Sequence, residues 1–211
     1  QEILSSYDFL IEMMVHFGLT LKEHESLLEQ QEEMRSEMLV ASKIQNMLLK
    51  TEKPKMDYLD VGIVSMPIRD MNGDYVYANE ENECFNVAVT DVVGKGVPAA
   101  LCMSMVKYGL DTLRYSNSEP SYVLEVLNRI IEQSVDDSMF VSMFYGRYDH
   151  NKGIFTYGSA GHEPALYYCA KENRFYTLES KGLLLGVMGD VKYTQYDFPL
   201  QEGDFIIIMT D

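Results

Sequence analysis

Apolar residues recur at alternating steps of three and four from Ile3 to about Leu48, with few helix-breaking residues between them. Such spacing predicts an α-helix whose apolar seam pairs with a second helix in a left-handed supercoil. Before Leu21 further apolar residues widen the stripe, which favours a helical bundle, and after Leu27 the stripe narrows to a seam. The register contains Ile3, Ser6, Leu10, Met13, Phe17, Thr20, His24, Leu27, Gln31, Met34, Met38, Ala41, Gln45 and Leu48.

The helical arm, residues 1–50, is expected to pair weakly. Several seam positions are polar, and Gly18 inside the helix costs about 1 kcal/mol relative to Ala. Weak pairing suits a switch, so we expect this arm to form a homodimer and to act as a regulatory linker. The alternative is a connector helix that packs on its own domain. We expect His24 to be a solvated residue and not a pH sensor.

A second domain is predicted after residues 51–60, where Pro54 and several charged residues interrupt the periodicity. Short β-type runs follow, and several of them alternate in polarity as half-buried antiparallel strands do. Two predicted helices, Pro98–Leu113 and Ser121–Val135, interrupt the strands, which makes residues 61–211 an α+β domain with layered sheets. The predicted strands are Val61–Met66, Tyr75–Ala78, Cys84–Thr90, Met139–Tyr148, Ile154–Ser159, Ala165–Cys169, Tyr193–Phe198 and Phe205–Met209.

Charge and composition narrow the function classes. The formal net charge of -16 leaves no basic patch for nucleic acid, so protein partners are expected. Three cysteines without CxxC spacing suggest neither a disulfide framework nor a zinc site, which fits a cytoplasmic protein. No apolar run is long enough to span a bilayer, so no membrane partner is expected. Both ends of the sequence look cut, and we expect the second domain to be incomplete at its carboxyl end.

Three aspartates stand where predicted strands begin or end: Asp74, Asp91 and Asp211. Carboxylates that converge at strand ends repel one another unless hard cations neutralise them. The three residues therefore suggest a Mg²⁺ or Mn²⁺ site. Taken singly, an Asp after a strand is more often a turn former or a helix cap, because its side chain bonds nearby backbone NH groups.

Two other chemistries are poorly supported by the sequence. A nucleotide-binding P-loop is rejected, because Lys95 is followed by Gly and residue 89 is Val where the first glycine is required. Catalytic cysteine chemistry is also disfavoured, because all three cysteines lie in apolar contexts typical of buried thiols.

The segment Asp91–Ala100 joins a metal-type Asp to a glycine-rich turn and a helix start. It resembles the D-x-x-G-K-G-x-x-A signature of the metal-dependent protein phosphatase (PPM) family, in the bacterial branch that includes the sporulation and sigma-B regulatory phosphatases. The arm resembles the linker of the sigma-B activating members. The resemblance covers about residues 60–211, and it continues through Ala100–Met105, Met139–Phe140, Ser159–Pro164 and Gly182–Gly186.

That resemblance implies a layered α-β-β-α sandwich of antiparallel sheets with two divalent ions, Mn²⁺ or Mg²⁺. By the family motif, Asp91 bridges both ions and the backbone carbonyl of Val92 is a further ligand. Asp74 binds one ion directly or through water, and Asp211 binds the other. A further family Asp lies beyond the carboxyl end of this sequence, so this chain alone is not expected to build the complete site.

Other positions are expected to lie near the metals without being ligands. These are the loop residues Gly94, Lys95 and Gly96, together with His162, for which a loop-packing role is an equal alternative.

The chain departs from the family pattern in two places. Asn72 replaces a small residue, and Val92 replaces the Gly common after the bridging Asp. Neither change removes a ligand. Many relatives outside this branch carry a His where this chain has Val93, which leaves the general acid unassigned.

The resemblance also implies a function. The protein is expected to be a phosphoserine/phosphothreonine protein phosphatase that dephosphorylates an anti-sigma-factor antagonist and so activates a stress-response sigma factor. An activator protein is expected to bind the amino-terminal region or linker, and the two helices of the domain are expected to relay its effect to the metal site. The alternative is a noncatalytic scaffold that binds the activator through the arm.

Overall fold

The computed structural model describes residues 2–65, 73–94, 96–116, 118–135 and 138–210, with side chains from residue 13 onward. The chain divides into two compact units, residues 1–43 and residues 44–211. The α+β class, the antiparallel sheets and the long amino-terminal helix are confirmed. No helix in these ranges combines the length and the apolarity that crossing a membrane requires.

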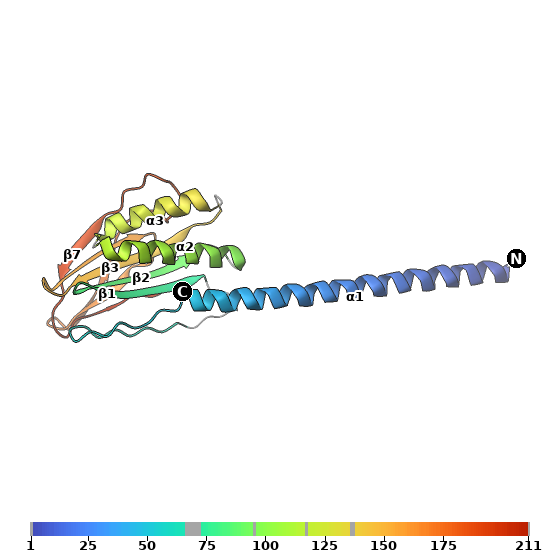
Figure 1. Ribbon diagram of the computed structural model, residues 1–211, viewed down its shortest axis with the longest axis horizontal. Helices are drawn as coiled ribbons and strands as arrows, with labels where there is room; N and C mark the ends of the chain where they lie inside the picture. Colours follow the sequence, from blue (N-terminus) through green and yellow to red (C-terminus); the bar gives the residue numbers. More distant parts are fainter. Residues whose placement is uncertain (1, 66–72, 95, 117, 136–137, 211) are drawn as a thin grey trace. The chain divides into compact units, whose positions relative to one another are not determined.

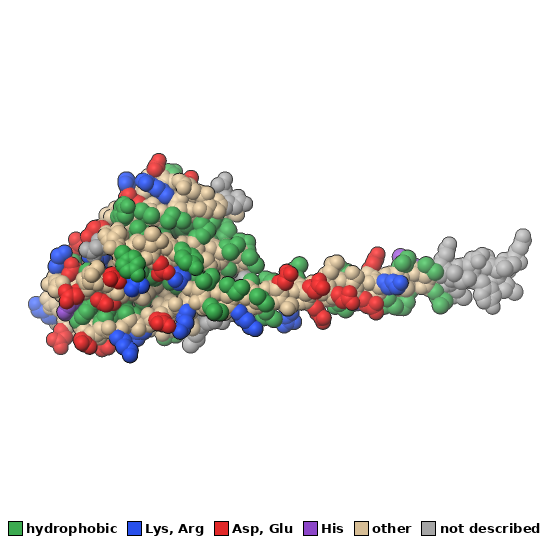
Figure 2. Space-filling model, viewed as in Figure 1, with side chains coloured by type: hydrophobic (Ala, Val, Ile, Leu, Met, Phe, Trp, Pro, Cys, Tyr) green, Lys and Arg blue, Asp and Glu red, His purple; other side chains and the backbone are tan. Residues whose placement is uncertain are grey.

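The helix α1 runs from Glu2 to Leu48 (Figure 1) and makes up the first unit, while its last five residues, 44–48, are assigned to the second unit. Its predicted seam is exposed from Met13 to Met38, whereas Gln45 near the end of the helix is buried. Met13, Phe17, Leu27 and Met34 are each more than half exposed. Figure 2 shows hydrophobic and acidic side chains along the described part of this helix. Within the first unit, the described residues therefore leave this part of the apolar seam uncovered.

The second unit is built on two antiparallel sheets. The larger has the strand order β1-β2-β3-β4-β7 and the smaller has the order β6-β5-β8. In the larger sheet the strands are β1 (Asp74–Glu81), β2 (Cys84–Val92), β3 (Val141–Asp149), β4 (Ile154–Ala160) and β7 (Gln195–Pro199). In the smaller sheet they are β5 (Ala165–Cys169), β6 (Arg174–Leu178) and β8 (Phe205–Ile207).

Two helices cover one face of the larger sheet, α2 (Val97–Leu113) and α3 (Pro120–Ser134), with the short 3₁₀ turn η1 (Arg114–Ser116) between them (Figure 1). Both predicted helices are thus confirmed. Each has Pro in its first turn, where a missing N–H is tolerated. Their apolar faces pack on the sheet, burying residues such as Met103 and Leu127 completely.

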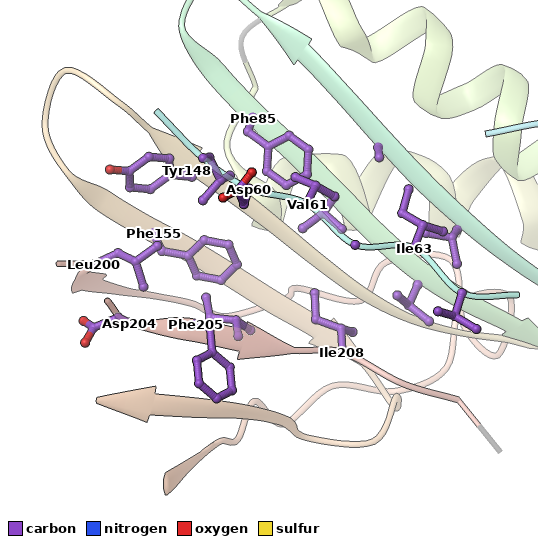
Figure 3. A pocket seen from close by; sticks show the side chains of 18 residues that line it. Asp60, Val61, Ile63, Phe85, Tyr148, Phe155, Leu200, Asp204, Phe205 and Ile208 are labelled. Carbon is purple, nitrogen blue, oxygen red and sulfur yellow. The ribbon is translucent and has the colours of Figure 1, made fainter. Parts of the chain in front are cut away.

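The opposite face of the larger sheet packs on the smaller sheet. Phe144 and Phe155 of the larger sheet form one buried cluster with Ala165 and Leu178 of the smaller sheet. A cavity of about 220 Å³ remains between the sheets, lined mainly by apolar side chains (Figure 3).

The predicted strand Val61–Met66 is wrong for residues 61–65, which belong to no sheet, while Met66 lies outside the described residues. Residues 59–64 line the cavity between the sheets, and Val61 and Ile63 are among the lining residues labelled in Figure 3. The sequence pattern of residues 61–64 therefore reflects side chains that line an apolar cavity. It gave no information on whether a neighbouring strand was available to pair with their backbone.

A two-residue turn, Asn82 and Glu83, joins β1 to β2. Both residues have positive φ, 52° and 60°, which is the requirement of a type I′ turn and matches the twist of paired strands. The ladder that follows runs without a bulge from the pair Glu81 and Cys84 to the pair Asp74 and Asp91. The turn therefore sets which residues face each other at the far end of the hairpin.

Candidate metal centre

Asp74 and Asp91 are direct partners in the β1–β2 ladder. Successive side chains of a strand point to opposite faces, so residues two apart share a face. Val76 of β1 and Val89 of β2 line the cavity between the sheets, and each stands two residues from one of the aspartates. Both carboxylates therefore belong to the inter-sheet face, side by side at one end of the larger sheet.

The Val92 carbonyl lies near the same point. A Cβ added to Gly73 would lie 3.5 Å from Asp91 Oδ1 and 3.5 Å from the Val92 oxygen. The Val92 N–H donates to the Gly73 carbonyl at 3.2 Å, which holds the two segments together. Glycine at position 73 therefore leaves open a space that two predicted ligand oxygens border.

This donor set fits the expected ions. It consists of carboxylate and carbonyl oxygens, which Mg²⁺ and Mn²⁺ prefer, and it lacks the thiolates or imidazoles typical of zinc sites. A divalent cation would also offset the repulsion between the two adjacent carboxylates. Within the described ranges, no three His, Cys, Asp or Glu side chains gather closely enough to hold a metal ion. The predicted third carboxylate, Asp211, lies outside those ranges.

The last described residues approach Asp74. The Thr210 hydroxyl donates to Asp74 Oδ1 at 3.3 Å, although the two residues are far apart in sequence. This contact places the backbone that leads to Asp211 beside the first carboxylate. Thr210 was not predicted as a site residue, because nothing in the local pattern after the Phe205–Met209 run shows where that run leads.

His162 connects two strand ends at this site. Its Nδ1 lies 2.8 Å from the Ser142 hydroxyl and its Nε2 lies 3.1 Å from the Met209 carbonyl. A carbonyl only accepts, so Nε2 carries a proton toward Met209, and in the neutral ring Nδ1 accepts from Ser142. Ser142 is the ladder partner of Asp91. His162 is 8% exposed, and this bonding is that of a packing and orienting residue.

The predicted loop residues Gly94 and Gly96 have positive φ, 126° and 78°. An added Cβ would meet nothing within 4 Å at either position. The glycines are therefore required by backbone conformation and not by close packing. Gly96 caps the start of α2, so the turn connects the Asp91 strand to that helix. The third predicted residue, Lys95, lies outside the described residues.

Neutral buried groups lie in the core between the larger sheet and its two helices. Burial raises the pKa of the Tyr75, Tyr77 and Tyr145 hydroxyls, so these residues carry no charge at neutral pH. Burial also raises the pKa of Cys102 to about 11, which leaves this thiol protonated and a poor nucleophile. Together these groups put no charge into the core behind the carboxylates.

Solved structures identify the class of fold. The SiaA-PP2C domain of Pseudomonas aeruginosa matches with a TM-score of 0.67 and 16% identity, over 84% of this chain and 71% of that chain. The RsbU and RsbW domains of Rv1364c from Mycobacterium tuberculosis match with a TM-score of 0.59 and 27% identity, over 68% of this chain and 40% of that chain. The chain has the PP2C-type phosphatase fold.

Sequence comparison then identifies the family. The stage II sporulation protein E (SpoIIE) family profile matches residues 81–211, and the chain belongs to this family. A relative from Bacillus subtilis (strain 168), phosphoserine phosphatase RsbU, is 47% identical over all 211 residues. The present chain spans 63% of the length of that relative.

Proposed function

We propose that this chain belongs to a metal-dependent protein phosphatase that hydrolyses phosphoserine or phosphothreonine. The observation that carries this proposal is the pairing of Asp74 with Asp91 beside the Val92 carbonyl, at the open space that Gly73 leaves. The 47% identity to a protein named phosphoserine phosphatase RsbU supports the same chemistry.

Four ligands are proposed to hold two Mn²⁺ or Mg²⁺ ions. Asp91 would be shared by both ions, the Val92 carbonyl and Asp74 would be further ligands, and Asp211 would bind one ion. When bound, such ions lower the pKa of a coordinated water and stabilise charge on the phosphoryl group. The protein orients its own ligands, because Thr210 bonds Asp74 while Ser142 and His162 brace the strands on either side.

We further propose that the substrate is a phosphorylated anti-sigma-factor antagonist, whose dephosphorylation activates a stress-response sigma factor in the cytoplasm. The similarity to RsbU supports this substrate. An activator protein would act through residues 1–50, residues 51–60 would connect the arm, and residues 61–211 would form the phosphatase domain. The exposed seam of α1 supports pairing of two such arms in a homodimer.

The second candidate is a noncatalytic scaffold that binds the activator through its arm. The observation that favours it is the exposed seam, which fits a binding role without any chemistry. Metal binding without turnover would distinguish this candidate from the first.

The decisive experiment is Mn²⁺-dependent release of phosphate from a phosphoserine antagonist protein by the full-length protein and by three variants. Asp91→Ala and Asp74→Ala should each lose roughly a thousandfold in rate, because metal stabilisation contributes several kcal/mol. Asp197→Ala, at an exposed position of β7, is the matched control and should retain activity.

Two other outcomes would redirect the interpretation. If the full-length protein bound manganese but released no phosphate even with its activator, the scaffold would be the better account. If it bound no manganese, the assignment of Asp74, Asp91 and Asp211 would be wrong.

A further inference from the structure

Asn128 is a fully buried polar residue of α3 whose amide is engaged on both sides. Its Nδ2 donates to the carbonyls of Met188 and Gly189 at 2.7 and 3.0 Å, and its Oδ1 accepts from the Gly186 N–H at 2.9 Å. The side chain is 0% exposed. A buried amide with all three bonds to one loop fixes that loop to the helix, since breaking a bond would leave a polar atom unpaired.

The same loop contains the second glycine of the Gly182–Gly186 motif, which the metal chemistry leaves unexplained. Gly186 has φ +92°, and an added Cβ would lie 2.9 Å from Ile131 of α3 and 3.3 Å from the Met139 carbonyl. Only glycine lets the loop fit between the helix and the segment before β3. Residue 186 therefore lies in close contact with both α3 and the segment before β3.

On its other side the loop is bonded to β3. Leu185 and Val141 exchange two backbone hydrogen bonds, 2.9 and 3.1 Å long. Val141 is in turn the ladder partner of Val92. The residue before it, Phe140, accepts from the Val93 N–H at 2.8 Å.

That last bond bears on a proposed ligand. The Val92 carbonyl and the Val93 N–H belong to one planar trans peptide unit, so they point in opposite directions. Fixing the N–H on the Phe140 carbonyl therefore fixes the direction of the Val92 oxygen, which borders the space at Gly73 together with Asp91 Oδ1. A shift of residues 140–141 would turn this oxygen.

We propose that Asn128 is a positioning residue for the Val92 carbonyl, acting from α3 through residues 185–186 and 140–141. This inference rests on the proposed function, because it concerns the affinity of the same metal site. The route consists of hydrogen bonds and one strand pairing, each short and directional.

Asn128→Asp in the full-length protein tests this role. The substitution keeps the shape of the side chain but replaces two donors with an oxygen that faces the Met188 and Gly189 carbonyls. We expect the Mn²⁺ dissociation constant, measured by calorimetry, to rise roughly tenfold, as for other residues that orient ligands indirectly. Hydrogen exchange should become faster at the amides of Gly186, Leu185 and Val93.

The matched control is Leu124→Ala, which also removes a buried contact of α3. Leu124 packs toward Gly158 of β4, where its Cδ1 would lie 3.1 Å from an added Cβ, and it makes none of the three hydrogen bonds by which Asn128 holds the loop. It should lower the melting temperature while leaving the Mn²⁺ dissociation constant and the exchange at Gly186 unchanged.

The possible results separate the two proposals. If the unsubstituted protein bound no manganese, the proposed function and this inference would fail together. If it bound manganese and Asn128→Asp bound it equally well, only this inference would be overturned. The same holds if Leu124→Ala weakened manganese binding as much as Asn128→Asp did, because general loosening of α3 would then explain both.

Discussion

The amino-terminal helix and the sheet domain use apolar residues in opposite ways. Phe17 of α1 is 64% exposed, whereas Phe144 at the centre of the larger sheet is 0% exposed. Both are phenylalanines in regular secondary structure, so neither propensity nor residue type explains the difference. The domain buries its apolar faces between its own layers, whereas the seam of α1 is exposed from Met13 to Met38.

This difference shows which region gains stability by burying its own apolar side chains and which does not. Burying a large apolar side chain contributes about 1.5 to 3 kcal/mol, and Phe17, Leu27 and Met34 gain none of it in the structure. A long helix in water draws most of its stability from packing of one face. The arm gains no such stabilisation within its own unit, and we propose that the arm of a second copy provides it.

The largest expected effect comes from truncating matched phenylalanines in the two regions. Phe144→Ala should lower the free energy of unfolding by about 3 to 5 kcal/mol, because it leaves a cavity between the sheets. Phe17→Ala should change the unfolding of the domain by less than about 0.5 kcal/mol. Urea unfolding followed by circular dichroism is suitable, because the chain has no tryptophan. Equal losses from both variants would contradict the comparison.

The next effect concerns self-association of the arm. Replacing Met34 and Met38 together by Gln should raise the dimer dissociation constant roughly tenfold to a hundredfold, since apolar area is lost from the seam. Sedimentation equilibrium measures this change, and Glu33→Gln, beside the seam, is the control. If the double variant kept both its dimerisation and its stimulation by the activator, the proposed role of the arm would be wrong.

A smaller effect is expected when a histidine of the domain and a histidine of the arm are each replaced. His162→Gln removes the imidazole that joins Ser142 to the Met209 carbonyl, and it should weaken manganese binding by roughly tenfold. His24→Gln, on an exposed position of α1, should leave manganese binding unchanged. Calorimetric titration of both variants checks this prediction, and no difference between them would remove His162 from the support of the site.

The smallest effect is a pH dependence in the smaller sheet. The Asp204 carboxylate accepts hydrogen bonds from the Ala170 N–H at 2.8 Å and the Tyr167 hydroxyl at 2.7 Å. Burial by itself raises the pKa of this carboxyl, but these bonds and one from the Gln201 N–H outweigh burial and lower the pKa. Its stabilisation is therefore present above the unfolded pKa and is lost as the pH falls through the folded pKa.

Asp204→Asn should thus lower the free energy of unfolding by about 1 kcal/mol at pH 7. The difference from the unsubstituted protein should shrink below pH of about 3.9, the ordinary carboxyl pKa. Urea unfolding at several pH values checks the trend. Tyr167→Phe, which removes only one donor, should give a smaller change of the same sign, and a difference that grew toward acid pH would reverse the assignment.

Sequence pattern predicted the parts of the fold that depend on neighbouring residues. Both domain helices, the long arm and most strands were predicted because their periodicity and end residues are local. The strand β6 was missed, since four of its five residues are exposed and it includes Arg174. The run from Val61 was mistaken for a strand for the converse reason, because its apolar residues line a cavity without a paired edge.

The candidate site shows the same division between local and distant information. The motif around Asp91 is continuous, so it could be found and interpreted from the sequence alone. Ser142 and Thr210 could not, because their relation to Asp91 and Asp74 depends on strand register and on a contact between residues distant in sequence. Asn128 has no local signal at all, since its partners lie about sixty residues further along the chain.

The hairpin turn at Asn82 and Glu83 is joined to the candidate site by strands β1 and β2. The site therefore constrains the relative lengths of these two strands more than it constrains the residues of the turn. The turn and the carboxylate pair lie at opposite ends of one uninterrupted ladder. Inserting one residue into a single strand would therefore send Asp74 or Asp91 to the helix side of the sheet, although the insertion lay far from the proposed metal site. Lengthening both strands by one residue at the turn would leave the pair intact. Variation in hairpin length is thus tolerated only when it is symmetric.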